Sequence, residues 1–186
     1  MAITINGNGT LSGVTAGLTG AAMPSGSVLQ VKSTTKTDYA SQSLATDTWW
    51  NYTDSSLRAT LTPIASNSII LLSAQITIGE ASGQWYAFKF MKDGTTDITD
   101  VIGDAEGNRD RVTGCIDKST HDDNNRTINL QGVTTAGDTN ERYYSLSIKH
   151  SSGLTRTMEI NRAPNDINDY LYWRGISTIT AMEIKA

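Results

Sequence analysis

The sequence has 186 residues, of which 38% are hydrophobic and 18% are charged, and its net charge is −4. This length suits about one domain. The charge balance and the absence of a Lys/Arg cluster argue against nucleic acid as a partner. No apolar run approaches the roughly 20 residues that span a bilayer, and the N-terminus lacks a basic residue ahead of an apolar block. We therefore expect no membrane insertion and synthesis in a cytoplasm.

The composition favours an all-β fold, because 44 Ser and Thr residues and 16 Gly suit exposed strand faces and turns. Cys115 is the single cysteine, so no intrachain disulfide can form. We expect it to be a buried or half-buried thiol, since no neighbouring residue would activate it as a nucleophile. A core without crosslinks usually gains stability from size or oligomerisation.

Residues 1–31 contain no charged side chain, and Lys32 is the first charge. A free disordered tail normally stays soluble through charge. We therefore predict that residues 1–27 form an extended arm docked on another subunit or another protein, the alternative being an unstructured uncharged leader. The predicted partner-binding residues are its spaced apolar side chains, Ile3, Ile5, Leu11, Val14 and Leu18.

Residues 28–186 are predicted to form the folded body. It begins with a half-exposed strand over Val28–Thr37, an irregular stretch over Asp38–Asp54 and a short strand over Arg58–Pro63. Next comes Ser68–Gly79, in which alternate side chains are apolar, namely Ile70, Leu72, Ala74, Ile76 and Ile78. A strand places alternate side chains on one face, so this segment is predicted to be the central strand of a sandwich.

A hairpin is predicted next, because Tyr86, Phe88 and Phe90 share one parity in Gln84–Lys92 and the tight-turn dipeptide Asp93-Gly94 follows. Further strands are expected over Ile98–Ile102, Arg111–Ile116, Thr127–Val133, Arg142–Ser151, Met158–Asn161 and Ser177–Lys185. Asp117–Arg126 is expected to be an exposed loop, and Arg162–Arg174 to contain at most one helical turn. The predicted fold is an all-β, antiparallel β-sandwich, jelly-roll-like, with the extended N-terminal arm.

The sequence offers few groups for catalysis. His121 and His150 are both expected to be solvent-exposed, and no Gly-x-Ser-x-Gly, His-x-x-x-His or phosphate-binding loop is present. Two carboxylates for glycoside hydrolysis could come from Asp97, Asp100, Asp104 and Glu106. A depolymerase usually needs a long cleft, however, so we expect no enzyme activity and no cofactor.

Carboxylates also alternate through the loop after residue 102, at Asp104, Glu106 and Asp110, with Asn108 between them. This spacing resembles a calcium loop, but the terminal bidentate Glu and the flanking helices are missing. No metal site is therefore expected.

Aromatic residues gather in two irregular segments, at Trp49, Trp50, Tyr170, Tyr172 and Trp173. They could stack on the sugar rings of a glycan, or they could close the sandwich ends and fill a subunit interface. We favour the interface. Arg174, beside Trp173, is consistent with an intersubunit ion pair.

Four blocks carry a resemblance to a known family: MAITINGNGTLSG, LTPIASNSIILLSAQITI, IGDAEGNR and INRAPNDINDYLYWRGISTITAMEI. In these blocks the chain resembles small bacteriophage tail fiber or virion structural proteins of phages that infect cyanobacteria and marine bacteria. It departs from them in Asp117–Arg126 and Thr134–Glu141.

The resemblance implies a β-rich homo-oligomer, with a trimer as the expected form, located in the virion and assembled in the host cytoplasm. Its other expected partners are virion proteins of the tail or capsid and a host cell-surface glycan. The leading hypothesis is a small tail fiber or fiber-like component that docks through its arm and presents the sandwich for host attachment. The alternatives are a capsid decoration or cement protein and a carbohydrate-binding receptor-recognition module.

Overall fold

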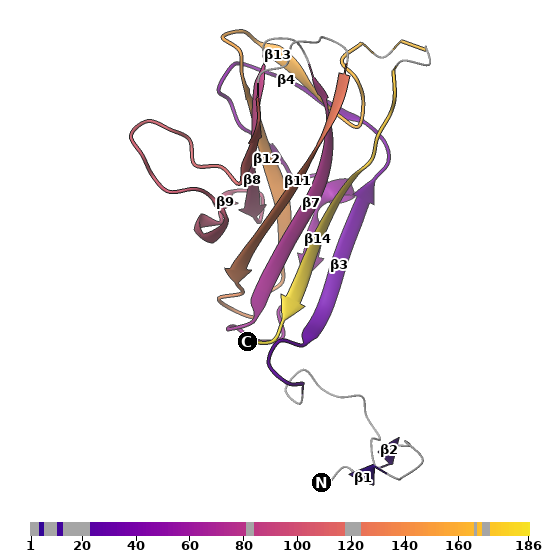
Figure 1. The fold of residues 1–186 in the computed structure, drawn as a ribbon, viewed down its shortest axis with the longest axis vertical. Helices are drawn as coiled ribbons and strands as arrows, with labels where there is room; N and C mark the ends of the chain where they lie inside the picture. Colours follow the sequence, from indigo (N-terminus) through magenta and orange to yellow (C-terminus); the bar gives the residue numbers. More distant parts are fainter. Residues whose placement is uncertain are drawn as a thin grey trace.

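The computed structural model describes residues 4–5, 11–12, 23–80, 84–117, 124–165, 167–168 and 172–186. Two six-stranded antiparallel sheets share one hydrophobic core and form a β-sandwich, which confirms the predicted fold class (Figure 1). Within the predicted arm, β1 (Thr4–Ile5) pairs with β2 (Leu11–Ser12). No helix in the described part of the chain has the length and apolar character that a membrane span needs. The division at residue 27 stays a prediction.

The first sheet is built around its longest central strand, β7. Its strands are β3 (Val28–Lys36), β4 (Ala40–Leu44), β7 (Ile69–Glu80), β11 (Asn124–Thr135), β13 (Arg156–Ile160) and β14 (Ser177–Ile184). β11 pairs with one edge of β7 along its whole length. β14 and β13 share the other edge end to end, and β3 and β4 pair outside them. The predicted central strand is therefore confirmed.

The second sheet has the β8–β12 pair at its centre. Its strands are β5 (Trp50–Tyr52), β6 (Ala59–Leu61), β8 (Trp85–Lys92), β9 (Thr96–Asp97), β10 (Gly114–Ile116) and β12 (Arg142–Ser151). β9 and β10 pair with the free edge of β8, and β5 and β6 pair with the free edge of β12. Two short strands therefore line each side of the central pair.

The core lies between the inward faces of the two sheets. All five alternating residues of β7 predicted to be buried are at most 3% exposed. Opposite them, the second sheet contributes its large inward side chains, Tyr86, Phe88, Phe90, Tyr144, Leu146 and Ile148, all at most 2% exposed. Each such side chain stabilises the fold by about 1.5–3 kcal/mol relative to an exposed one. The predicted alternation in β7 and β8 is confirmed.

The predicted hairpin after β8 is also confirmed. Asp93 and Gly94 have φ angles of 52° and 70°, and the Thr95 amide donates to the Lys92 carbonyl at 3.3 Å. Two successive positive φ angles define a type I′ turn, which matches the twist of paired strands.

The strand predicted over Ile98–Ile102 is wrong. The chain instead forms a 3₁₀ turn, η3 (Thr99–Val101), and buries Ile98 and Val101, which lie three residues apart as that turn requires. Val101 lies against Gly132 of β11, where a Cβ atom would meet Val101 Cγ1 at 2.5 Å. Of the strand predicted over Arg111–Ile116, only Gly114–Ile116 pairs.

Two stretches predicted to be irregular contain strands. Asp38–Asp54 holds β4 and β5, followed by a second 3₁₀ turn, η2 (Ser55–Leu57). Asn124–Arg126, predicted to be part of an exposed loop, extends β11 against the end of β7. The backbone hydrogen bonds of the long partner strand outweigh the polar character of these side chains. Residues 118–123 lie outside the described part of the chain.

Candidate functional site

The outer face of the second sheet carries a cluster of charged and aromatic side chains. Lys89 of β8 and Lys149 of β12 lie under the Trp49 ring, with their Nζ atoms 4.4 and 5.4 Å from its centroid. A cation over the face of an indole ring is attracted to its π electrons. Lys149 is only 7% exposed. Trp49, half-buried, therefore covers this part of the sheet.

Carboxylates from three separate segments pair with these two lysines. Lys89 Nζ lies 2.6 Å from Asp97 Oδ1, and Lys149 Nζ contacts Asp110 Oδ2 and lies 3.5 Å from Asp47 Oδ1. The Ser151 hydroxyl, together with Lys149, holds the pKa of the Asp47 carboxyl below its usual range. These contacts fasten the segments around Asp47, Asp97 and Asp110 to the sheet.

An apolar hollow of about 270 Å³ lies next to this cluster. Its lining includes Trp85 and Ala87 of β8, Cys115 of β10, and Lys149 and Ser151 of β12. Trp85 is 46% exposed, so part of an aromatic side chain lies at the surface beside the hollow. The volume lies near the lower end of the range for small-molecule pockets and suits one ring of a ligand.

The structure changes the prediction for two residues of this hollow. Cys115, predicted to be buried or half-buried, is exposed, because Ile116 takes the inward position of β10. Trp85 was not among the predicted binding aromatics. Its signal was present, since it has the parity opposite to the buried Tyr86, Phe88 and Phe90.

The structure separates the predicted aromatics. Trp49 joins the lysine cluster, whereas Trp50 packs edge-on against Tyr52, with ring centroids 5.2 Å apart, and contacts the core. Tyr172 is half-buried and Trp173 is 74% exposed. The Trp173 carbonyl accepts from the Asn125 side chain of β11, which belongs to the first sheet. Tyr170 lies outside the described residues.

Arg174, predicted to be consistent with an intersubunit ion pair, contacts an aromatic ring of its own chain. Its Cζ lies 5.4 Å from the centroid of the Tyr39 ring, and Arg162 Cζ lies 4.1 Å from the same ring. Arg162 also pairs with the buried Glu159, at 2.9 Å. Tyr39 therefore lies against two guanidinium groups.

His150, predicted to be exposed, is fully buried. β12 continues through it, so it takes an inward position opposite Tyr86. Its Nε2 lies 3.1 Å from the Leu44 carbonyl, and its Nδ1 lies 3.4 Å from the Ser152 hydroxyl. This histidine joins the ends of β12 and β4. His121 lies outside the described residues.

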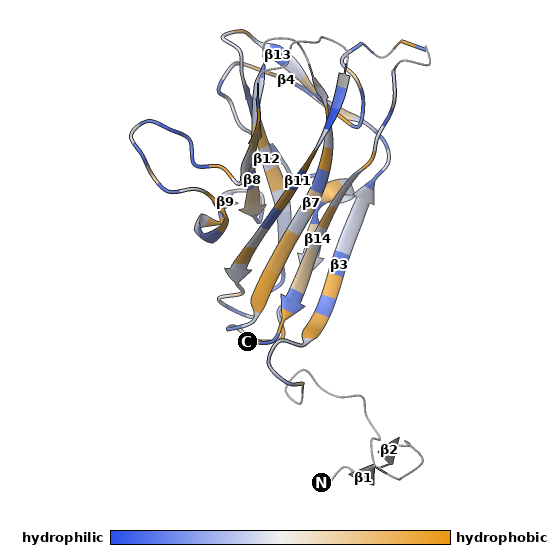
Figure 2. Ribbon diagram, in the orientation of Figure 1, coloured by the Kyte–Doolittle hydropathy of each residue, from blue (hydrophilic) through white to orange (hydrophobic). Residues whose placement is uncertain are grey.

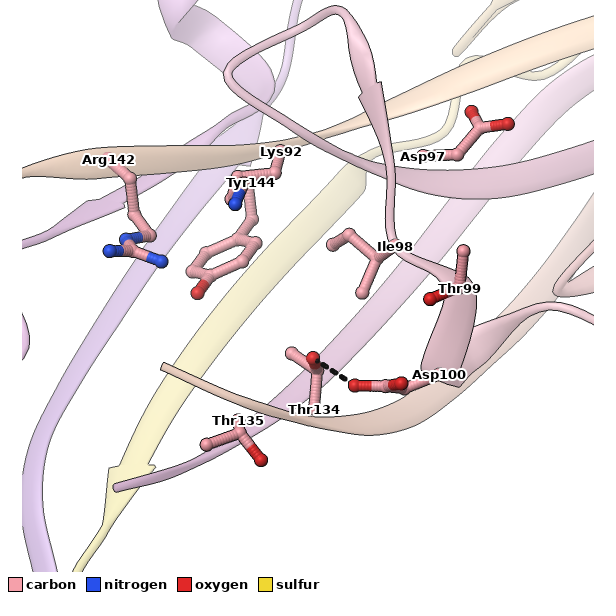
Figure 3. A pocket seen from close by; sticks show the side chains of 9 residues that line it. All are labelled: Lys92, Asp97, Ile98, Thr99, Asp100, Thr134, Thr135, Arg142 and Tyr144. Carbon is pink, nitrogen blue, oxygen red and sulfur yellow. Dashed lines mark hydrogen bonds between the residues drawn. The ribbon is translucent and has the colours of Figure 1, made fainter. Parts of the chain in front are cut away.

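Two of the four carboxylates considered for glycoside hydrolysis line a polar hollow of about 150 Å³ (Figure 3). Asp100 accepts from the Thr134 hydroxyl at 2.7 Å, and Asp97 pairs with Lys89. Figure 3 shows Tyr144 and Ile98 between the two aspartates and Arg142. Burial raises the pKa of the Tyr144 hydroxyl, so it stays protonated near neutral pH. The other two carboxylates, Asp104 and Glu106, are exposed.

The loop with calcium-like spacing gives no cluster of metal ligands in the described residues, where no three His, Cys, Asp or Glu side chains gather. Of the predicted arm residues, Ile5 and Leu11 pair across β1 and β2. Ile3, Val14 and Leu18 lie outside the described part of the chain.

No protein-family model and no curated protein sequence matches the chain. Among solved structures, the fold is similar to a chain in the structure of infectious bursal disease virus Gx strain, with a TM-score of 0.40 and 11% identity. The match covers 84% of this chain and 37% of the viral chain. The present chain thus spans well under half of that protein's length.

Proposed function

We propose that this chain is a structural component of a bacteriophage particle, a small tail fiber or fiber-like protein without enzyme activity. The observation that carries the proposal is the uncharged N-terminal segment. Its last residues are hydrogen-bonded to the sandwich, so the place where the segment leaves the sandwich is fixed. Gly26 N donates to the Lys185 carbonyl at 2.8 Å, and Lys185 N donates to the Ser27 carbonyl at 2.9 Å. Lys185 Nζ also contacts the Met23 carbonyl.

The exit point and the C-terminus lie at the same end of the sandwich. Figure 1 shows the start of β3 beside the end of β14, with β4 and β13 at the opposite end. A protein built this way can attach to a large assembly at one end and present its far end to a host cell. The sequence resemblance to small phage virion proteins supports the same role.

In this proposal the apolar residues of the arm bind another virion protein, and the bodies associate as a homo-oligomer, with a trimer as the expected form. An arm that becomes ordered on a particle needs no charge of its own, because the particle keeps it in solution. The absence of charge would hinder a free tail of this composition.

The proposal is tested by deleting residues 2–22, which keeps the residues that bond to Lys185. We expect the shortened chain to remain folded and oligomeric and to be absent from purified particles. A matched control carries the same 21 residues in scrambled order. Incorporation of the deletion variant at the wild-type level would contradict the proposal.

A capsid decoration or cement protein would have the same arm and body. The two roles differ in the number of copies per particle, because a decoration protein covers the capsid lattice and a tail fiber is present in a few copies. Quantitative gels of purified particles separate them, and a copy number close to that of the major capsid protein would favour the decoration role.

A second candidate function is recognition of a host glycan, favoured by the half-exposed Trp85 beside the apolar hollow. Sugar rings stack on tryptophan through their apolar faces, while lysine and serine supply hydrogen bonds at the rim. Replacing Trp85 or Trp49 with Ala should then abolish binding to host lipopolysaccharide. Trp173→Ala, which removes a more exposed tryptophan elsewhere, is the control. Equal loss with all three variants would count against this hollow as the site.

A further inference from the structure

The outer face of the first sheet carries no charged side chain over four neighbouring strands. β7 and β14 bury alternate residues, and directly paired residues lie on the same face, so the outward positions of all four strands follow from the register. They are Val31, Ser33 and Thr35 of β3, Thr178, Thr180, Met182 and Ile184 of β14, Ile69, Leu71, Ser73, Gln75 and Thr77 of β7, and Thr127, Asn129, Gln131, Val133 and Thr135 of β11. We call this surface the neutral face.

One end of the neutral face is apolar. Val133, Leu71, Met182 and Val31 are paired in register and form a row across all four strands. In the next row, Ile69 pairs with Ile184, which pairs with Val28. Val28, Val31 and Val133 are each about half exposed, at 48%, 49% and 52%. Figure 2 shows hydrophobic colouring of β7 and β3 at their ends nearer the C-terminus.

The other end of the neutral face is polar, and its hydroxyl groups on β3 and β14 are hydrogen-bonded to one another. The Ser33 and Thr180 hydroxyls lie 2.8 Å apart, and those of Thr35 and Thr178 lie 3.0 Å apart. Burying a hydroxyl group costs free energy when it loses water without gaining a partner. On β3 and β14 the partners are neighbouring side chains, so a second surface can cover these hydroxyl groups at small cost.

We propose that a second copy of this chain covers the neutral face, related by a rotation axis that runs parallel to the strands. Four strands about 4.8 Å apart and about eight residues long at 3.4 Å per residue give a footprint of roughly 500 Å² in projection. This is of the same order as the ~800 Å² of accessible surface that each partner contributes to a standard interface. A copy that presents the same uncharged surface leaves no charge unpaired.

The direction of the axis follows from the polarity of the face. An axis parallel to the strands brings the apolar rows of one copy against the apolar rows of the next. An axis that lies in the interface but runs perpendicular to the strands would instead place apolar rows on the hydroxyl rows. The parallel axis also makes the N-terminal segments leave from one end of the assembly, because Val28 lies in the apolar rows. Two copies satisfy this arrangement face to face, and three copies satisfy it with each neutral face shared between two neighbours.

This inference rests on the proposed function only in assuming a homo-oligomer, and it adds which surface the copies share. Its tests use purified protein without particles. The shared surface can therefore be disproved while incorporation through the arm is confirmed, and incorporation can be disproved while the shared surface is confirmed.

The first test replaces Val31 with Glu. A charge at this half-exposed position is harmless in a monomer but would be buried without a partner in the interface. We expect light scattering to show a multiple of the 20.1 kDa chain mass for the wild type and the mass of one chain for V31E. Val133→Glu, at the other end of the same row, should act alike. Leu154→Glu, at a loop residue that is 58% exposed, is the matched control.

A wild-type protein that is monomeric at high concentration would overturn the proposal. So would V31E and V133E proteins that keep the wild-type mass while remaining folded by circular dichroism.

The second test measures the direction of the axis. A spin label at Ser25→Cys, in a Cys115→Ser background, marks the end where the N-terminal segment leaves. A twelve-residue strand is about 40 Å long. We expect distances between labels on different copies to be well below that length. Distances of that length or more would place the labelled ends apart and overturn the parallel axis.

Discussion

The outer faces of the two sheets differ in charge and in cover. That of the second sheet carries Lys89 and Lys149, which pair with aspartates from three segments and lie under Trp49. That of the first sheet has no charged side chain at the outward positions of β3, β14, β7 and β11, and its charges lie at β13, where Glu159 pairs with Arg162. The second sheet is therefore covered in part by its own chain. The first sheet is covered by its own chain at Thr77, which is 5% exposed and donates to the Ile176 carbonyl, and it leaves its apolar rows for a partner.

The first sheet turns charged groups inward instead. Glu183 of β14 is fully buried and accepts from the Gln30 side chain at 2.6 Å and from Ile64 N at 2.8 Å. Lys36 of β3, 2% exposed, pairs with Asp38 at 2.9 Å. Two charged side chains therefore lie inside this sheet, whose core is otherwise apolar, while Val28, Val31 and Val133 lie outside and half exposed. The outward apolar residues are understandable if this surface is itself an interface.

The largest effect on stability is expected at Glu183. Glu183→Ala would leave the Ile64 amide and the Gln30 side chain without their acceptor, which costs about 2–3 kcal/mol of unfolding free energy. Glu183→Gln retains one acceptor oxygen and should cost less. Urea unfolding of the three proteins measures this order. Equal stability of all three would show that the inward charge does not hold this end of the sheet.

A smaller loss is expected for Lys149→Met on the opposite outer face. This change removes the cation under Trp49 and the partner of Asp110, and the two contacts together stabilise the fold by about 1–2 kcal/mol. Lys32→Met, at an exposed position of β3, should change the unfolding free energy by less than about 0.5 kcal/mol. If the two variants have equal unfolding free energies, Lys149 does not stabilise the fold through Trp49 and Asp110.

Stability should also depend on pH through Glu183. Burial alone would raise the pKa of this carboxyl, but the nearby Ser68 hydroxyl and hydrogen bonds from Gln30, Ile64 and Ala65 outweigh burial and lower it. The contribution is therefore present above the ordinary pKa of a glutamate and is lost as pH falls through the lower folded value. Urea midpoints between pH 7 and roughly pH 3 should fall less for Glu183→Gln than for the wild type. Parallel curves would contradict this account.

The smallest effect is expected within the hydroxyl rows. Thr180→Val removes one hydroxyl pair on an outer surface, and we expect the unfolding free energy of the monomeric V31E protein to change by at most about 0.5 kcal/mol. A loss of 2 kcal/mol or more in that background would mean that the neutral face serves folding and not association.

Alternation in the sequence predicts the strands that bury one whole face, as in β7, β8 and β12. It fails where another interaction sets the local structure. Val101 becomes a turn residue because Gly132 leaves room for it, and Asn124–Arg126 become strand because β7 extends that far. His150 shares the parity of the inward Tyr144, Leu146 and Ile148, and it is buried because β12 continues through it, with the Leu44 carbonyl beside its ring.

The candidate site is less predictable than the fold. Trp49 could be chosen as an exposed aromatic, but its lysine partners come from β8 and β12, which are distant in sequence. Trp85 could have been chosen from its parity alone. The neutral face depends on the register between four strands, so the sequence shows its members only after the sheet is known.

The most direct test of the central claim compares one thiol on each outer face of the same protein. Thr180→Cys places a thiol on the neutral face, and the exposed Cys115 on the second sheet is the internal reference. Mass spectrometry after brief maleimide treatment should find Cys115 labelled and position 180 protected, with protection lost when V31E is added. Equal labelling of both positions in the wild-type background would contradict the account.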